Sequence, residues 1–190
     1  MKGTTKRSTI RTVLFGSAIA LWLGLIGMGA AATMRWEFTP GPIVGAEPLT
    51  GSRGLELVMV AHPFCPCTAA SLNQLRDIVV QSQGKLRTRI VFVGANMGSP
   101  SPNERAAQEI PDAGIQWVDA KQAQRFGAIT SGHVTLYRDG VPIFEGGITA
   151  SRGVVGDSAG QRAIETALRG QKPIAAAPVY GCALTPGESP

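Results

Sequence analysis

The sequence predicts an α/β domain with a mixed sheet flanked by helices, preceded by one N-terminal transmembrane helix. Short apolar runs alternate with segments of helical periodicity, which is typical of a parallel sheet covered on both faces. Two later apolar runs around Asp139-Gly140 predict an antiparallel hairpin added to that sheet. A chain of 190 residues is long enough for one such domain and too short for two of ordinary size.

An uncharged stretch, 13–32, is long enough for one helix to cross a bilayer. Every charged residue before it is basic, so the positive-inside rule places the basic tail 1–12 in the cytoplasm. We therefore expect a single-pass protein of the inner membrane, with its N-terminus cytoplasmic and its C-terminal domain periplasmic. The small residues of "GMGAAAT" leave open a cleaved signal peptide, which would export the same domain.

The formal net charge of +5 belongs mainly to this basic tail. Without the four basic residues of 1–12, the remaining 14 Lys and Arg nearly balance the 13 Asp and Glu. A nearly neutral domain argues against a nucleic-acid-binding surface. The glycine-rich stretch 151–160 lacks the Lys-Ser/Thr ending of a phosphate loop and predicts a turn, so no nucleotide is expected either.

The elements follow in order after an irregular segment, 33–54, which is rich in proline and glycine and predicts a linker. Three predicted strands and the two strands of a hairpin are apolar runs, and four predicted helices have helical spacing or capping signals. The strands are Leu55–Ala61, Thr88–Asn96, Ile115–Asp119 and the hairpin His133–Thr149; the helices are Thr68–Gln83, one beginning near Asn103, Ala120–Phe126 and one capped by Asp157 or Ser158. The domain spans 55–170, and an irregular tail, 171–190, carries Cys182.

The stretch "AHPFCPCTAASL" places two cysteines at a helix start. Pro63 and Pro66 keep His62 and Cys65 out of the helical region, and proline is well suited to the first position of a helix. Cys65 and Cys67 should then lie near free backbone N–H groups and the positive end of the helix dipole. That environment favours the thiolate, which attacks disulfides and also binds metal.

A strand that leads into paired cysteines at a helix start, with a later hairpin and terminal helix, resembles the thioredoxin-like fold superfamily. The stretches "HPFCPCTAASL", "GGITASRGVVGDSAG" and "VYGCAL" are most similar to the thioredoxin-like proteins labelled RedB. The resemblance implies an oxidoreductase without a cofactor, acting on protein thiols or disulfides. It implies that Cys65 attacks and Cys67 resolves, with His62 and Pro66 beside them.

The sequence departs from that family at two places. One residue separates the cysteines instead of two, and a disulfide across so small a ring is strained. The distant Cys182 offers an alternative resolving thiol without this strain. In addition, the family's cis-proline before the hairpin is replaced by Ser131, Gly132 or His133, which by resemblance would face the cysteines.

A second interpretation is a copper-delivery protein. Two thiolates and an imidazole suit Cu(I) or zinc, and the candidate ligands are His62, Cys65, Cys67 and His133. A peroxidase is disfavoured, because His62 stands where such enzymes carry a threonine. A purely structural or binding role for the same fold is the remaining alternative.

Overall fold

A computed structural model gives the fold of residues 4–94 and 98–184, with side chains described from residue 13 onward. The chain divides into two compact units, Met1–Thr39 and Pro40–Pro190. The first unit consists of helix α1, Thr4–Glu37. Its segment Val13–Glu37 is long and apolar enough to cross a membrane, a property that a signal sequence near an N-terminus shares.

The second unit is built on a five-stranded sheet with the order β4-β3-β2-β6-β7. The first three strands along the chain pair in parallel, and the last two pair antiparallel, so the predicted mixed sheet is confirmed. The strands are β2 Leu55–Ala61, β3 Leu86–Val93, β4 Ala113–Val118, β6 His133–Arg138 and β7 Val141–Gly146. The central strand β2 is buried along nearly its whole length, which explains its continuous apolar run.

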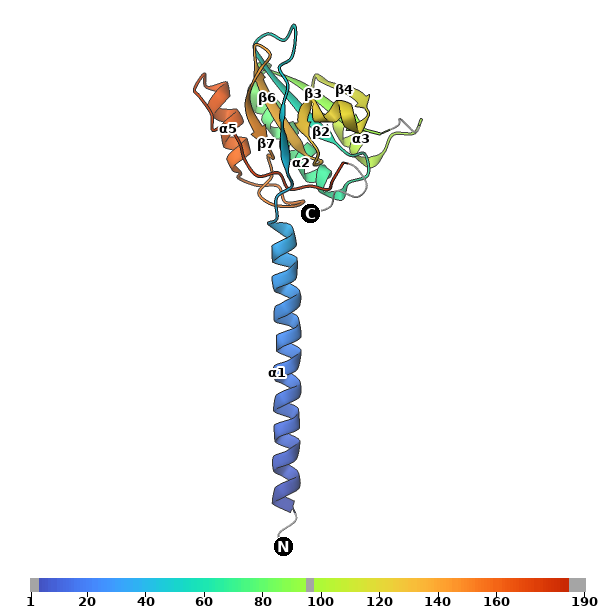
Figure 1. The fold of residues 1–190 in the computed structure, drawn as a ribbon, viewed down its shortest axis with the longest axis vertical. Helices are drawn as coiled ribbons and strands as arrows, with labels where there is room; N and C mark the ends of the chain where they lie inside the picture. Colours follow the sequence, from blue (N-terminus) through green and yellow to red (C-terminus); the bar gives the residue numbers. More distant parts are fainter. Residues whose placement is uncertain (1–3, 95–97, 185–190) are drawn as a thin grey trace. The chain divides into compact units, whose positions relative to one another are not determined.

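Three helices cover one face of this sheet (Figure 1). They are α2 Pro66–Ser82, α3 Pro102–Gln108 and α5 Ala159–Leu168. Their apolar side chains pack with Leu57, Met59 and Ala61 of β2 in one core. Alternate residues of β2, Val58 and Val60, point to the opposite face and pack in a second core.

The second face is covered by the short helix α4, Ala120–Gln124, and by elements that the sequence did not predict. Strands β1 Ile43–Ala46 and β5 Phe126–Ala128 form a small antiparallel sheet of their own. Residues 33–54 therefore differ from the predicted linker, because they contain the end of α1 and strand β1. The glycines and prolines around β1 hide the alternating pattern by which strands are recognised.

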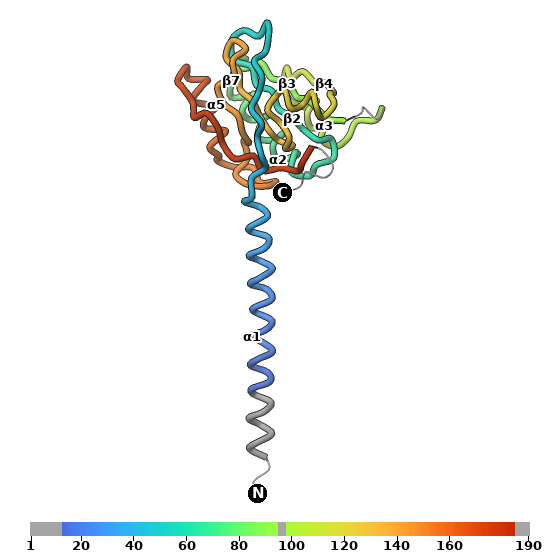
Figure 2. Tube along the Cα trace, viewed as in Figure 1, coloured from blue at the N-terminus to red at the C-terminus, as the bar shows by residue number. Residues whose placement is uncertain are grey.

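The tail after α5 has no helix or strand among its described residues, 171–184, yet it is packed against the domain. Ala177, Val179 and Leu184 are buried. Gly41 donates its backbone N–H to the carbonyl of Val179, and Figure 2 shows the tail lying beside this early segment. The tail is thereby held at the end of the sheet where α2 begins.

Candidate thiol site

The three cysteines of the chain lie together. All three sulfur atoms are within 4.8 Å of one another, and the Sγ atoms of Cys65 and Cys182 are 2.9 Å apart. Cys65 is 3% exposed and Cys67 is 9% exposed, while Cys182 is half-buried. The structure thus brings together the three predicted thiols although Cys65 and Cys182 are 117 residues apart in sequence.

The start of α2 positions Cys65 and Cys67 as the prolines predict. Cys65 has extended backbone angles and directly precedes the helix, and Pro66 is the first helical residue. The side chain of Cys65 makes no capping hydrogen bond, and its sulfur instead contacts the sulfur of Cys182. Cys67 lies in the first turn, on the buried side of the helix.

Asn103 holds the loop that presents Cys65. Its side-chain amide donates to the carbonyls of His62 and Cys65, at 3.0 and 2.9 Å. His62 itself accepts the backbone N–H of Phe64 at Nδ1, and burial lowers the pKa of its imidazole. Asn103 is a site residue that sequence reasoning missed, because the sequence indicated only that a helix begins near it.

The residues before β6 hold the tail in front of α2. Ser131 donates its backbone N–H to the carbonyl of Cys182 at 2.8 Å, and Leu184 donates to Ile129 at 2.9 Å. Thr130 and Ala183 form an antiparallel bridge between these two bonds. A short strand-like segment of the tail therefore positions Cys182 beside Cys65.

Ser131 and Gly132 also contact the cysteine loop directly. The hydroxyl of Ser131 accepts the backbone N–H of His62 at 2.8 Å and lies 2.7 Å from the hydroxyl of Thr68 in α2. Gly132 has a φ of +87° and donates its N–H to Val60. Gly132 lies against α2, since an added Cβ would lie 2.9 Å from the hydroxyl of Ser71.

His133 requires a correction, because it does not face the cysteines. Along β6, Val134 and Leu136 point to the core under α2, so His133 and Thr135 point to the other face. There His133 is fully buried, its Nε2 is 3.0 Å from the hydroxyl of Thr135, and burial lowers its pKa to about 4. The predicted ligand set of two histidines and two cysteines is not assembled; the clustered ligand atoms are those of the three cysteines.

Arg152 is a second residue that joins the site only in three dimensions. It is buried, and its guanidinium donates to the carbonyl of Gly181, the residue before Cys182. Its positive charge acts to lower the pKa of Cys67. The glycine-rich stretch around Arg152 therefore belongs to the thiol site, with Gly153 against the backbone of Cys67.

The three thiols have different proton affinities. Burial acts to raise the pKa of Cys65, but hydrogen bonds from Cys182 and Thr68 outweigh it and leave the pKa lowered. Burial and the neighbouring Cys65 raise the pKa of Cys67, and the same causes raise the pKa of Cys182 to about 12. Cys65 is consequently the thiol that ionises first, and the other two keep their protons to higher pH.

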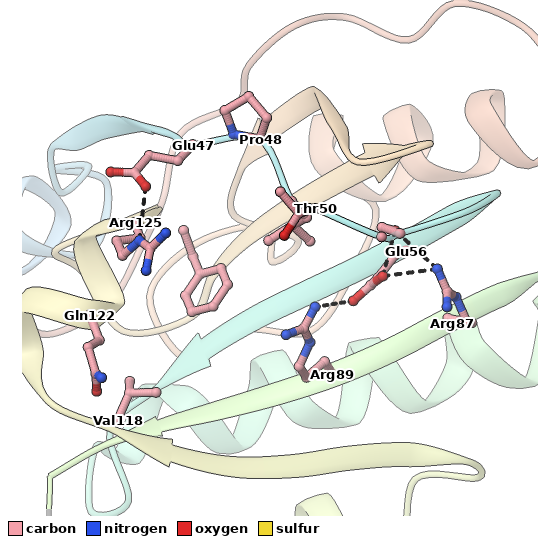
Figure 3. Close-up of a pocket in the computed structure, with 13 residues that line it drawn as sticks. Glu47, Pro48, Thr50, Glu56, Arg87, Arg89, Val118, Gln122 and Arg125 are labelled. Carbon is pink, nitrogen blue, oxygen red and sulfur yellow. Dashed lines mark hydrogen bonds and ion pairs between the residues drawn. The ribbon is translucent and has the colours of Figure 1, made fainter.

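A cavity lies elsewhere, on the face of the sheet away from α2 (Figure 3). It measures about 520 Å³, and Glu56 with Arg87 and Arg89 forms a network of ion pairs along one wall. Burial opposes ionisation of Glu56, but bonds from Ser52 and Arg89 outweigh it and lower its pKa. Glu56 is thus engaged by both arginines, and this wall keeps one net positive charge. We take the three sulfurs as the candidate site, because they are nucleophilic groups that the structure gathers at one point.

Comparison with known proteins adds no family to this description. No model of a known protein family matches the chain, and no curated protein matches it significantly.

Proposed function

We propose that this protein is a membrane-anchored, extracytoplasmic thiol–disulfide oxidoreductase of thioredoxin-like type, with Cys65 and Cys182 as its redox pair. The observation that carries the proposal is the 2.9 Å between their sulfurs, beside a third thiol at the start of a helix. The lowered pKa of Cys65 supports its role as the attacking group. Cys67 is then a nearby third thiol rather than the principal resolving one.

The reaction follows from the proton affinities. The Cys65 thiolate attacks one sulfur of a substrate disulfide, forms a mixed disulfide, and releases the other substrate sulfur as a thiolate. The loss of negative charge on Cys65 removes one cause of the raised pKa of Cys182. Cys182 can then lose its proton, attack Cys65, release the second substrate thiolate, and leave a Cys65–Cys182 disulfide. Two electrons pass to the substrate, and the reverse sequence oxidises a substrate dithiol.

The thioredoxin-like assignment is supported by the arrangement around the site. A parallel β2-α2-β3 unit carries the cysteines at the helix start, and an antiparallel hairpin with a last helix completes the layers. The segment before β6 lies against the N-terminus of α2, where the resemblance expects it. The apolar segment Val13–Glu37 of α1 and the basic residues before that segment support anchoring in the inner membrane with the domain in the periplasm.

One observation favours a second function, the binding of Cu(I). Three sulfurs within 4.8 Å of one another form a soft, compact ligand set, with Cys182 in place of the histidines expected from sequence. The charge of Arg152 would offset part of the negative charge of three thiolates. The two functions share their residues, so one experiment separates them.

The test is a redox titration of the metal-free protein, with each thiol identified by alkylation and mass spectrometry. We expect Cys65 and Cys182 to oxidise together, the Cys182→Ser variant to shift the pairing to Cys67 or stop it, and Cys65→Ser to abolish it. Oxidation of neither cysteine at any potential, together with binding of one Cu(I) per chain, would establish the copper function instead. If both experiments are negative, the site is structural.

A further inference from the structure

The tail occupies the place that a substrate of the proposed reaction needs. The sulfur of Cys182 lies 2.9 Å from Cys65, and Cys65 is 3% exposed. A substrate sulfur must approach Cys65 as closely, so it takes the position that Cys182 holds. The residues that contact the tail therefore form a substrate site, which the tail segment around Cys182 occupies as an internal ligand.

The hydrogen bonds that seat the tail involve its backbone. Ser131 donates to the carbonyl of Cys182, Leu184 donates to Ile129, and Arg152 donates to the carbonyl of Gly181. Backbone bonds of this kind accept any extended polypeptide that adds an antiparallel strand. Nothing in these three bonds requires that the strand come from the same chain.

Side-chain selectivity arises at two positions of the seated segment. An added Cβ on Gly181 would overlap the carbonyl oxygen of Ser131 and lie 2.9 Å from its carbonyl carbon. Because both are backbone atoms, no side-chain movement can make room for it. The position before the reacting cysteine thus accepts glycine alone.

The second selective position is two residues beyond the cysteine. Leu184 is 6% exposed and packs in the core that contains Val58, Val60 and Val91. Ala183 between them is half-buried and leaves its position permissive. The seated pattern is therefore glycine, cysteine, any residue, and a large apolar residue.

We propose that the substrate is an extended polypeptide segment of the pattern Gly-Cys-x-Leu, which replaces residues 181–184 as an antiparallel strand beside Ile129–Ser131. The proposal rests on the proposed thiol–disulfide function. Cys65 attacks the substrate cysteine's sulfur within its disulfide, the S–S bond breaks, and the partner thiol leaves as a thiolate. The tail then returns, and Cys182 releases the reduced segment.

The test uses the full chain with Cys67→Ser and Cys182→Ser, so that Cys65 is the sole thiol. The probe is the peptide Tyr-Gly-Cys-Ala-Leu, activated as a mixed disulfide with coloured thionitrobenzoate, whose release is followed by absorbance. Matched peptides carry alanine for glycine, or serine for leucine. Reaction of each peptide with glutathione gives its intrinsic reactivity for normalisation.

We expect the glycine peptide to react about tenfold or more faster than the alanine peptide, because the alanine methyl overfills the contact with Ser131. The serine-for-leucine peptide should also be slower. Equal normalised rates for all three peptides would overturn the substrate pattern while leaving the redox function standing. No reaction at Cys65 with any peptide in a folded protein would overturn both.

The same glycine-to-alanine change in the tail, rather than in the peptide, should have the opposite effect on the reaction rate. Gly181→Ala, added to the same two substitutions, should loosen the internal ligand and accelerate the reaction with the glycine peptide. Far-ultraviolet circular dichroism establishes that this variant is folded. A decreased or unchanged rate in the folded variant would show that the tail does not compete for the site.

Discussion

At the residue scale, the contact between Cys65 and Cys182 favours ionisation of Cys65 over Cys182. The two sulfurs share a hydrogen bond of 2.9 Å, and once Cys65 is ionised this bond with Cys182 is the largest influence that lowers its pKa. A thiolate that accepts a hydrogen bond is stabilised relative to the thiol. In the proposed reaction, the resolving thiol therefore also stabilises the Cys65 thiolate until the substrate takes its place.

Replacing Cys182 should change the titration of Cys65. In a Cys67→Ser background, Cys182→Ala removes the donor and should raise the pKa of Cys65, while Cys182→Ser retains a hydroxyl donor. Thiolate absorbance in the ultraviolet, followed against pH, measures both. Coincident titration curves for the alanine and serine variants would show that Cys182 does not activate Cys65.

His133 shows how burial fixes a protonation state. Its imidazole is fully buried with Thr135 at 3.0 Å, and its Nδ1 and the neighbouring Tyr137 hydroxyl and Glu145 Oε2 have no hydrogen-bond partner among the described residues. Burial lowers the pKa of His133 to about 4, from the ordinary value of 6.5. The folded protein consequently holds this imidazole neutral at a pH where the unfolded chain would protonate it.

This difference predicts a loss of stability in acid. The contribution of His133 is fully present above pH 6.5 and is lost as the pH falls toward 4, by up to about 3 kcal/mol. His133→Gln, which cannot be protonated, should show a smaller loss over the same interval. Urea unfolding at several pH values measures the free energies, and parallel pH profiles for the two proteins would contradict the assignment.

At the scale of elements, the turn before β6 connects the sheet with α2. Gly132 has a φ of +87° and donates to Val60, while Ser131 meets His62 and Thr68. A side chain at Gly132 would be strained by the backbone and would also lie close to the hydroxyl of Ser71. The turn thus needs glycine for two separate reasons.

The two reasons can be separated by a matched substitution. Gly84 follows α2 with a φ of +78° and open space around it, so Gly84→Ala incurs the backbone strain alone, about 1–2 kcal/mol. Gly132→Ala should cost about 1 kcal/mol more than Gly84→Ala, because the side chain of Ser71 must also shift. Urea denaturation measures both, and equal losses would mean that the contact with Ser71 is easily relieved.

The elements were predictable where local sequence decides them. Strand β2 has the predicted bounds, and α2 begins at Pro66 because two prolines restrict the backbone before it. Strands β1 and β5 were not predicted, because each is short and contains glycine, and their pairing joins residues at least 80 positions apart. Such strands exist through tertiary packing rather than through their own propensity.

At the scale of the whole molecule, the site is partly a product of long-range packing. The prolines predicted Cys65 and Cys67 at the helix start, but the seat of Cys182 depends on Ser131 and on the burial of Leu184. His133 was misplaced because one step along β6 reverses the face of the sheet. No local pattern reports that register.

The long loop between Cys65 and Cys182 predicts a large effect of oxidation on stability. A disulfide across 117 residues removes much entropy from the unfolded chain and should stabilise the domain by about 4–5 kcal/mol at most. A Cys65–Cys67 bond closes a ring too small to contribute comparably. Urea unfolding of oxidised and reduced protein, with Cys67→Ser as control, measures the gain; equal midpoints would exclude the long-range bond.

The grouping of three thiols also has a consequence for electron counting. A disulfide uses two sulfur atoms, so a molecule with a Cys65–Cys182 disulfide keeps one thiol, that of Cys67. An isolated chain can store two electrons but cannot exhaust its thiols alone. The remaining thiol of Cys67 is buried, and Arg152 acts on it electrostatically. In the proposed chemistry it can attack the disulfide formed by its two neighbours and move that bond without any external reagent.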